Sequence, residues 1–421
     1  MSSVTVKWKA GSLTGTQLSG VQQFSGIPYA QPPLGALRFR PPVATQWPSS
    51  LDATRAMPVC PQLPSRLRDV MGDFEAVQSE DCLRLTVWTP AADNKKRPVV
   101  VWFHGGAWQS GGGALDWYDG AALSRLGDVV VVGVNYRLAS LGWLYVPGQT
   151  GNVGLLDHEA ALDWVSQHIE AFGGDPDQVT AMGQSAGGFN IAAMLTRRPK
   201  FHRAILQSAS LGRGFRDADA ADALSQVFLN AAGVSTLEQA RALPVETLLK
   251  TQQAEPVIHA LKAEGANRSL FCPVMDGAVI DTNRPDLLRI AAGHVDVLVG
   301  YTKNEMAAFP GTSVDAQSDA LGDKIFGAPG RQWADDARAQ GKHAWVFRFD
   351  YGPNPAHGAC HCIELPFMFG TLEAFSKAPF LKGMDPAHGQ YLAGKMQGAW
   401  IAFIRGGSPG WDEAPHIHIY Q

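Results

Sequence analysis

The chain has 421 residues and a formal net charge of −4 at pH 7, and 45% of its residues are hydrophobic while only 18% are charged. This composition excludes a disordered chain, because the apolar residues suffice for a sizeable core. The lack of a basic surplus makes nucleic acid an unexpected partner. The five cysteines are too few for a disulfide scaffold, and their spacing fits no zinc template.

The same composition gives no sign of a membrane or secretion signal. The first twenty residues alternate polar and apolar side chains without the hydrophobic stretch of a signal peptide. The longest apolar runs, such as Val129 to Val132, have the length of a strand and are too short to span a membrane. We therefore expect a soluble, cytoplasmic protein with no membrane partner, present as a monomer or a small homo-oligomer.

The first 90 residues predict antiparallel strands. They contain turn-rich hairpin patterns and a dense cluster of proline and glycine between Gly26 and Pro42. Turn residues of this kind separate short strands that pair with their neighbours. We expect these strands at the edge of the sheet that the later strands form.

Later segments predict a parallel sheet. Short apolar runs bounded by turn residues occur at Val99–Phe103, Asp128–Asn135, Val179–Met182, Val295–Val299 and Ala344–Asp350. Helical patterns lie between them, as at 156–172, where Leu162, Val165 and Ile169 recur at spacings of 3 and 4. Continuous apolar strands separated by helices are typical of a parallel sheet covered on both faces, so the predicted fold class is α/β.

No repeat, low-complexity tract or long linker interrupts the chain, so we expect a single domain over residues 1–421. Residues 215–265 read as helices with polar faces, and Ser235 with Glu238 is a candidate capping box. This segment follows the central strands, where a cap over an active site could be inserted.

One serine lies in the G-x-S-x-G pattern of a nucleophile elbow, which spans 183–187 and is centred on Ser185. In this motif a sharp strand-to-helix turn lifts the hydroxyl clear of the sheet, and glycines flank it because a Cβ would clash. Ser408 lies in a second match at 406–410, but it follows a helical stretch and precedes Pro409. Ser185 follows a strand and precedes a helix-compatible segment. It is the predicted nucleophile, and Ser408 is the predicted loop serine.

A glycine pair after the strand at 99–103 predicts hydrogen-bond donors for a negatively charged oxygen. Residues 103–108 read Phe-His-Gly-Gly-Ala-Trp, which has the form of an HGG-type oxyanion loop. We expect the N–H groups of Gly105 and Gly106 to form an oxyanion hole with the N–H of Ala186, the residue after the predicted nucleophile.

Together these motifs resemble the type-B carboxylesterase family, a branch of the α/β-hydrolase fold that includes bacterial carboxylesterases, such as para-nitrobenzyl esterases, and the cholinesterases. The resemblance extends over nearly the whole chain and implies a mostly parallel central sheet with helices on both faces. Further matching segments are FSGIPYA at 24–30, PPLG at 32–35, SEDCL at 79–83, YDG at 118–120, NYR at 135–137 and FGGDP at 172–176.

A nucleophilic serine needs a general base. Among twelve histidines, His361 follows the strand at 344–350 and precedes Glu-Leu-Pro-Phe at 364–367. This place at the end of a strand is typical of the base of an α/β-hydrolase, and the sequence around it matches the family's motif for the catalytic histidine. His357, four residues earlier, is the rival candidate.

The base needs an acid that orients it. Glu305 ends the loop GYTKNE after the strand at 295–299, and this loop matches the family's pattern. Asp296 lies inside that strand and Asp276 in a turn, so both fit less well. The expected triad is therefore Ser185, Glu305 and His361, in the chain order that this fold uses.

The resemblance implies a serine carboxylesterase that hydrolyses small to medium neutral carboxylic esters through an acyl-enzyme intermediate, without a metal or a cofactor. One alternative is a carbamate or aryl-amide hydrolase with the same triad. Another is a non-catalytic interaction protein on the same fold, although relatives of that kind typically lack the serine or the histidine.

The helical cap is expected to be reduced, with cap or insert segments at about 210–270 and 306–343. Residues 215–265 are compact, and the stretch from Glu305 to His361 is shorter than is usual in the family. Five aromatic residues near the site loops favour a substrate with an apolar or aromatic group. They are Trp108, Trp117, Phe189, Phe271 and Phe309, and all but Trp117 are candidate pocket residues.

Several residues are given a role only by the resemblance. Gln184 stands where relatives often carry glutamate, a change expected to leave the elbow geometry intact, and Asn190 could replace a serine that helps the triad's hydrogen-bond network. Glu80 and Arg137 match positions that form a buried ion pair in relatives. Cys60 and Cys82 match a disulfide of secreted relatives, but we expect free thiols here.

Overall fold

The computed structural model describes residues 2–8, 11–265, 269–282, 284 and 286–421. Within these ranges one sheet contains twelve strands. Eleven of them follow the order β1-β2-β3-β5-β7-β6-β8-β9-β12-β13-β14, and β4 pairs with β2. Their bounds are β1 Ser2–Trp8, β2 Gly11–Leu18, β3 Val21–Pro28, β4 Ser50–Asp52, β5 Arg84–Thr89, β6 Arg97–Phe103, β7 Val130–Val134, β8 Gly174–Gln184, β9 Arg203–Gln207, β12 Asp296–Thr302, β13 Ala344–Phe349 and β14 Ile417–Tyr420.

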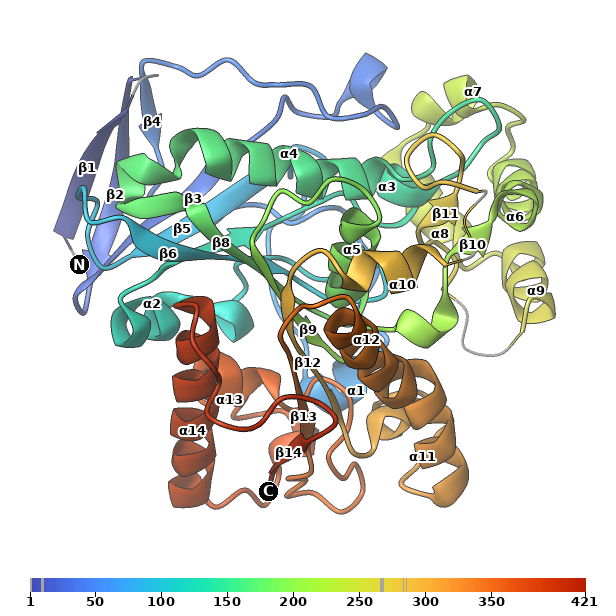
Figure 1. Cartoon of the computed structure of the whole chain (residues 1–421). Helices are drawn as coiled ribbons and strands as arrows, with labels where there is room; N and C mark the ends of the chain where they lie inside the picture. The colour runs from blue at the N-terminus through green and yellow to red at the C-terminus, as the bar shows by residue number, and fades with distance from the viewer. Residues whose placement is uncertain (1, 9–10, 266–268, 283, 285) are drawn as a thin grey trace.

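The amino-terminal part of the sheet is antiparallel, as the hairpin patterns predicted. Strands β1, β2, β3, β5 and β7 pair antiparallel in that order, and β4 runs parallel to β2. These strands form one edge of the sheet (Figure 1).

The rest of the sheet is parallel from β7 through β14. The five predicted strands appear as β6, β7, β8, β12 and β13, with bounds that differ by a few residues. Strand β7 begins at Val130 because Asp128 has a φ of 47° and ends the preceding helix. All five residues of β7 are buried, as expected for a strand covered on both faces.

Helices cover both faces of the parallel part (Figure 1). On one face lie α4 (Val153–His168) and α5 (Ala186–Leu195), with α10 (Leu287–Ala292) and α12 (Ala328–Ala339) beside them. On the other lie α2 (Ala121–Gly127), α13 (Leu365–Phe369) and α14 (Pro386–Ile404). Leu162 and Val165 of α4 are buried, and the short helix η3 (Ile169–Phe172) continues the predicted stripe.

The first predicted insert forms four helices grouped at one end of the molecule with the small sheet of β10 (Arg216–Asp217) and β11 (Val274–Met275) (Figure 1). They are α6 (Ala218–Ala231), α7 (Leu237–Arg241), α8 (Val245–Thr251) and α9 (Glu255–Ala263). The capping box of α7 is one residue later than predicted, because Thr236 and Gln239 make the reciprocal bonds.

The second predicted insert contains α11 (Ala316–Gly322), the π-helical turn η6 (Asp323–Gly327) and α12. Helix α12 packs against β12 and β13, so this part of the insert covers the sheet itself. The remaining short helices are η1 Gly35–Leu37, α1 Arg68–Met71, η2 Asp116–Tyr118, α3 Ala139–Trp143, η4 Leu211–Arg213, η5 Glu305–Ala308 and η7 Pro379–Leu381. Among the described residues, no helix combines the length and hydropathy that a membrane span requires.

Candidate active site

The predicted site residues follow strands β6, β8, β12 and β13 of the parallel sheet. Ser185 directly follows β8, the glycine pair Gly105-Gly106 follows β6, Glu305 follows β12 and His361 lies on the loop after β13. The carboxyl ends of parallel strands meet at one edge of a sheet, where open α/β folds bind ligands. The fold therefore brings the separate sequence motifs to the same edge.

Ser185 occupies a sharp, strained turn between β8 and α5. Its φ of 54° and ψ of −119° lie outside the regions that non-glycine residues prefer. A Cβ on Gly187 would collide with the carbonyl oxygen of Phe103, and a Cβ on Gly183 would lie 2.6 Å from the carbonyl carbon of Gly187. The glycines therefore permit the turn, and Ser185 remains partly exposed in otherwise buried surroundings.

The glycine loop after β6 packs directly on this turn. A Cβ on Gly105 would lie 3.1 Å from the Cβ of Ser185, so the backbone there is adjacent to the serine side chain. Gly106 has a φ of 106°, which a side chain would strain. Ala186 begins α5, where backbone N–H groups have no acceptor within the helix. The three predicted oxyanion donors thus belong to two backbone segments in contact beside Ser185.

The His104 side chain stabilises the glycine loop by bonding to its backbone. Its Nδ1 lies 2.7 Å from the Gly105 carbonyl oxygen, and the Tyr136 hydroxyl donates to the His104 carbonyl oxygen at 2.9 Å. Burial lowers the pKa of His104 to about 4, so the ring is neutral at pH 7. A neutral ring in contact with a carbonyl oxygen must donate from Nδ1, and this bond fixes the loop.

Glu305 and His361 form a buried pair. The Glu305 Oε2 atom lies 2.5 Å from the His361 Nδ1 atom, and each side chain is 1% exposed. The backbone N–H of Thr302 donates to the other carboxylate oxygen at 2.9 Å. Each carboxylate oxygen of Glu305 thus has its own partner. These two contacts fix the orientation of the Glu305 carboxylate and of the His361 ring.

Asn304 ties the glutamate loop to the histidine loop. Its side-chain oxygen accepts from the N–H of Ala359 at 3.0 Å, and its backbone N–H donates to the Ala359 carbonyl oxygen at 2.9 Å. The backbone N–H of His361 also donates to the Glu305 carbonyl oxygen at 3.3 Å. Sequence reasoning missed Asn304, which the loop GYTKNE contains without any pattern that marks its role.

The rival residues have other partners. Asp276 accepts from the backbone of its own turn, and Asp296 accepts from the N–H of His343. His357 lies in a turn closed by a bond to Asn354. Ser408 is an exposed loop serine after α14, as expected.

Gln184 engages the imidazole on the side opposite Glu305. Its amide nitrogen lies 3.1 Å from His361 Nε2 and 3.2 Å from the sulfur of Cys362. Since an amide N–H donates, Nε2 is the acceptor and the ring proton is on Nδ1, toward Glu305. Sequence reasoning treated Gln184 only as a neutral change in the elbow and missed this contact.

Two phenylalanine rings lie close to the His361 ring. The Phe309 ring centroid lies 5.3 Å from that of the imidazole, and the Phe326 centroid lies 4.8 Å from it. Phe309 was a predicted pocket residue, whereas Phe326 was missed. Phe326 comes from the π-helical turn η6, a local irregularity that no spacing in the sequence signals.

The other predicted pocket residues lie in the packed interior. Phe189 has no exposed surface and packs edge to face on Trp108 and Phe215, and Trp108 is 2% exposed. Phe271 packs on Phe228 of α6. Contact of these three aromatic residues with a substrate stays a prediction.

Three expectations about supporting residues need comment. The Asn190 side chain accepts from Trp108 Nε1 at 2.8 Å and lies 3.4 Å from the His158 ring, so its bonds are made outside the triad network. Cys60 and Cys82 are both buried free thiols, as expected. Hydrogen bonding to Cys60, together with burial, raises the pKa of the Cys82 thiol.

The expected ion pair between Glu80 and Arg137 is wrong. Arg137 instead pairs with the fully buried Asp157, with its Nη2 2.6 Å from Oδ1, and Glu80 accepts from Arg38 Nε at 2.7 Å. A buried arginine has no water to solvate its charge, so it requires a carboxylate partner. Helix α4 supplies Asp157 at that place.

A buried carboxyl group, that of Glu364, follows His361 by three residues in the chain. Glu364 accepts from Gln207 at 3.2 Å through Oε1, while its Oε2 has no hydrogen-bond partner among the described residues. Burial, with a smaller contribution from Glu305, raises the pKa of Glu364 to about 8. This group is therefore mostly protonated at neutral pH.

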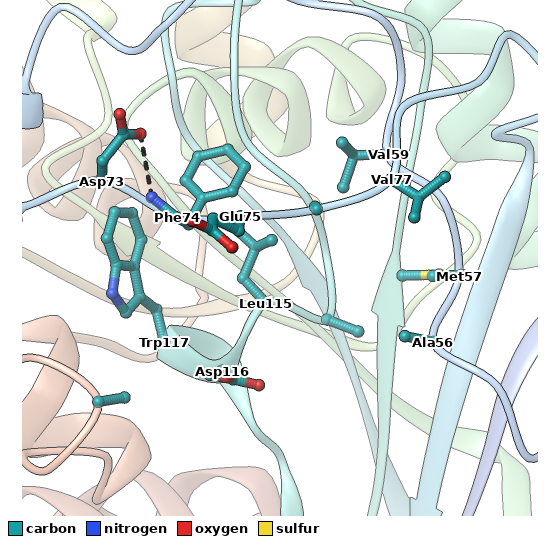
Figure 2. Close-up of a pocket in the computed structure, with 13 residues that line it drawn as sticks. Ala56, Met57, Val59, Asp73, Phe74, Glu75, Val77, Leu115, Asp116 and Trp117 are labelled. Carbon is teal, nitrogen blue, oxygen red and sulfur yellow. Dashed lines mark hydrogen bonds between the residues drawn. The ribbon is translucent and has the colours of Figure 1, made fainter.

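A pocket of about 360 Å³ is lined mainly by residues of the segments 56–77 and 114–117. Figure 2 shows its lining side chains. The pocket is lined by apolar side chains with Phe74 and Trp117 packed edge to face, and by the carboxylates of Asp73, Glu75 and Asp116. None of the three predicted catalytic residues lines it. In the ranges that the structure describes, no group of three or more His, Cys, Asp or Glu side chains could hold a metal ion.

A parallel sheet with a serine on a sharp turn at its carboxyl edge, beside a glycine loop and a Glu–His pair, defines the α/β-hydrolase class of proteins. The model of the carboxylesterase family matches residues 2–320 and 307–418 of this chain. The chain belongs to the carboxylesterase family and is a carboxylic ester hydrolase.

Individual relatives agree with this assignment. The chain is 34% identical to the para-nitrobenzyl esterase of Bacillus subtilis (strain 168), over 95% of this chain and 89% of that protein. It is 33% identical to the phenmedipham hydrolase of Pseudarthrobacter oxydans, over 96% of this chain and 90% of that protein. The solved structure of a thermophilic PNB esterase superposes with a TM-score of 0.86 at 31% identity, covering 98% of this chain and 94% of that one.

Proposed function

We propose that Ser185, His361 and Glu305 are the catalytic triad of this esterase and that the N–H groups of Gly105, Gly106 and Ala186 form its oxyanion hole. The observation that carries the proposal is the buried contact of 2.5 Å between Glu305 and His361 Nδ1 at the sheet edge where Ser185 emerges. The adjacency of Gly105 to the serine side chain supports the oxyanion hole.

In the proposed mechanism, Ser185 attacks the ester carbonyl while His361 Nε2 accepts the hydroxyl proton. Glu305 stabilises the imidazolium that forms, and the backbone N–H groups bind the oxyanion of the tetrahedral intermediate. His361 then protonates the leaving alcohol. Water repeats these steps on the acyl-enzyme, releases the acid and restores Ser185.

The Gln184 side chain has to move away from His361 in this mechanism. Its amide occupies the imidazole Nε2 atom that the serine proton must reach. We propose that substrate binding displaces this amide, after which the Ser185 hydroxyl takes its place. The cost is one hydrogen bond, about 1 kcal/mol, which contacts with the substrate offset.

For the substrate, we propose small to medium neutral carboxylic esters with an apolar or aromatic group. The rings of Phe309 and Phe326 close to His361 support this, because they place apolar groups next to the reacting centre.

A second candidate is carbamate hydrolysis by the same residues. A phenmedipham hydrolase is among the relatives of this chain. The chemistry differs only in the acyl group that is transferred to Ser185, so the same triad and oxyanion donors serve both substrates.

The test is hydrolysis of p-nitrophenyl acetate, butyrate and octanoate by the wild type, Ser185→Ala and the matched control Ser408→Ala. We expect a burst of p-nitrophenol from the wild type and from the Ser408 variant. Ser185→Ala should lose about 10⁴-fold or more of kcat/KM. If Ser185→Ala and the wild type hydrolyse these esters equally fast, the proposed triad is wrong. An aryl carbamate measured beside the esters decides the second candidate.

A further inference from the structure

One cation lies close to the proposed triad without taking part in it. Arg66 belongs to the segment just before the short helix α1, and its guanidinium carbon lies 5.2 Å from the centroid of the Phe309 ring. The same ring has its centroid 5.3 Å from that of the His361 imidazole. A single aromatic side chain therefore separates the guanidinium from the proposed general base.

Arg66 lacks the carboxylate partner that several arginines around the sheet have. Arg38, Arg97, Arg137 and Arg216 each form an ion pair with an aspartate or glutamate. Within the described residues, no acidic side chain lies at ion-pair distance from Arg66, whereas its neighbour Arg68 pairs with Asp69 at 3.7 Å. The guanidinium of Arg66 is thus a charge that the protein itself does not neutralise.

Arg66 combines exposure to solvent with partial desolvation of its charge. The residue is exposed to solvent, and yet burial among protein atoms lowers the pKa of its guanidinium. Protein atoms therefore surround part of this exposed side chain. There the charge loses part of its hydration without gaining a counter-ion, so an anion that enters would be stabilised.

Stacking on Phe309 leaves the guanidinium free to bind an anion. In a cation–π contact the planar group lies over the ring, and its N–H donors remain available at its edge. Those donors match the two oxygens of a carboxylate in a bidentate pair. Phe309 also limits the conformations of the side chain and so lowers the entropy cost of binding.

We propose that Arg66 is a specificity-determining residue that binds a carboxylate carried by the substrate at a distance from the ester bond. The inference rests on the proposed function and extends it. Neutral esters remain substrates, and esters of dicarboxylic acids or of hydroxybenzoic acids gain an additional contact. The carboxylate of such a substrate would lie beyond Phe309 while the ester carbonyl lies at Ser185.

The experiment compares matched ester pairs that differ by one remote charge. On the alcohol side the pair is 3-acetoxybenzoate and 3-methylphenyl acetate, and on the acyl side it is 4-nitrophenyl hydrogen adipate and 4-nitrophenyl hexanoate. The ratio of kcat/KM within each pair is measured for the wild type, Arg66→Met, Arg66→Lys and the control Arg68→Met. The intrinsic reactivity of each ester cancels when the ratios are compared between enzymes.

We expect Arg66→Met to lower the ratio of charged to neutral ester by about ten- to a hundredfold in at least one pair. Arg66→Lys should retain part of the preference because it keeps the charge without the bidentate geometry. Arg68→Met should leave both ratios unchanged. The side of the ester on which the ratio falls identifies where the carboxylate binds.

The inference is overturned if Arg66→Met leaves both ratios equal to those of the wild type. That outcome is distinct from failure of the proposed function, which would appear as absence of Ser185-dependent turnover of the neutral esters. A loss of rate shared by both members of a pair also contradicts it, because a general disturbance of the site does not discriminate between charges.

Discussion

Two regions supply the proposed site, and they are held together in different ways. The elbow region, on β6 and β8, is a contact between backbones. Gly105, Gly187 and the strained Ser185 pack so closely that a Cβ on either glycine meets the other segment. The acid–base region, after β12 and β13, is held by side chains, because Asn304 and Glu305 bond to the loop that carries His361. The elbow region depends on excluded volume and the acid–base region on hydrogen bonds.

The strongest test of this difference between the two regions is to add one methyl group to the elbow region. In Gly187→Ala the new Cβ would collide with the Phe103 carbonyl oxygen, and backbone cannot move aside as a flexible side chain can. We expect a loss of about 4 kcal/mol or more in the free energy of unfolding, measured by urea denaturation, with loss of esterase activity.

Gly394→Ala is the matched control, since Gly394 is an exposed position of α14 with open space around its Cβ site. This variant should be as stable as the wild type or more stable by about 1 kcal/mol, because alanine favours a helix. Equal stability of the two variants would show that excluded volume does not hold the elbow.

In the acid–base region, Glu305→Gln should act on the reaction more than on the fold. An amide nitrogen that donates to His361 Nδ1 would place the ring proton on Nε2, the atom that must accept the proton of Ser185. We expect kcat/KM for p-nitrophenyl butyrate to fall by about 10³- to 10⁴-fold. The melting temperature should change by only a few degrees.

Asp296→Asn in β12 serves as the control for that change. Asp296 accepts from the N–H of His343 and has no contact with His361. The variant should retain the activity of the wild type. Equal losses in the two variants would contradict the role of Glu305 as the orienting acid.

The smallest expected effect concerns the buried carboxyl group of Glu364. The folded protein holds the proton of Glu364 up to a pKa of about 8, whereas an unfolded chain releases it near 4.5. Since the folded state binds more protons between these values, the stability of the wild type should fall as the pH rises from 5 to 8. Each pKa unit corresponds to about 1.4 kcal/mol.

Glu364→Gln has no proton to release and should remove this loss. Its melting temperature should equal that of the wild type near pH 5 and exceed it increasingly toward pH 8. The exposed control Glu373→Gln should follow the wild type at every pH. A constant difference between Glu364→Gln and the wild type over this range would contradict the raised pKa.

The elbow region was predictable because its chemistry is local. The glycine spacings around Ser185 and after His104 state where a Cβ cannot be tolerated, and this constraint acts over five or six residues. Glu305 and His361 were predicted from their places after strands together with the family resemblance. Their partners Asn304 and Gln184 carry no pattern of their own, because a hydrogen bond between distant loops depends on how the strands are ordered.

The ion pairs show the same limit of prediction from the sequence. The family resemblance implied that Glu80 and Arg137 are partners, but the folded chain pairs them with Arg38 and Asp157. A charge pairs with the nearest opposite charge after packing, so the choice is made by the arrangement of α4 and the loops around it. The aromatic contacts of Phe326 and Arg66 arise in the same way.

The sequence by itself determined the class of fold and the predicted nucleophile, because apolar periodicity and glycine sterics act over short stretches of chain. Its resemblance to a family, together with positions after strands, supplied the other residues of the proposed triad. The tertiary structure decided which side chains support the triad, which aromatic rings lie beside His361 and that Arg66 stacks on one of those rings. Those properties depend on distances between segments that are far apart in the sequence, and only packing sets such distances.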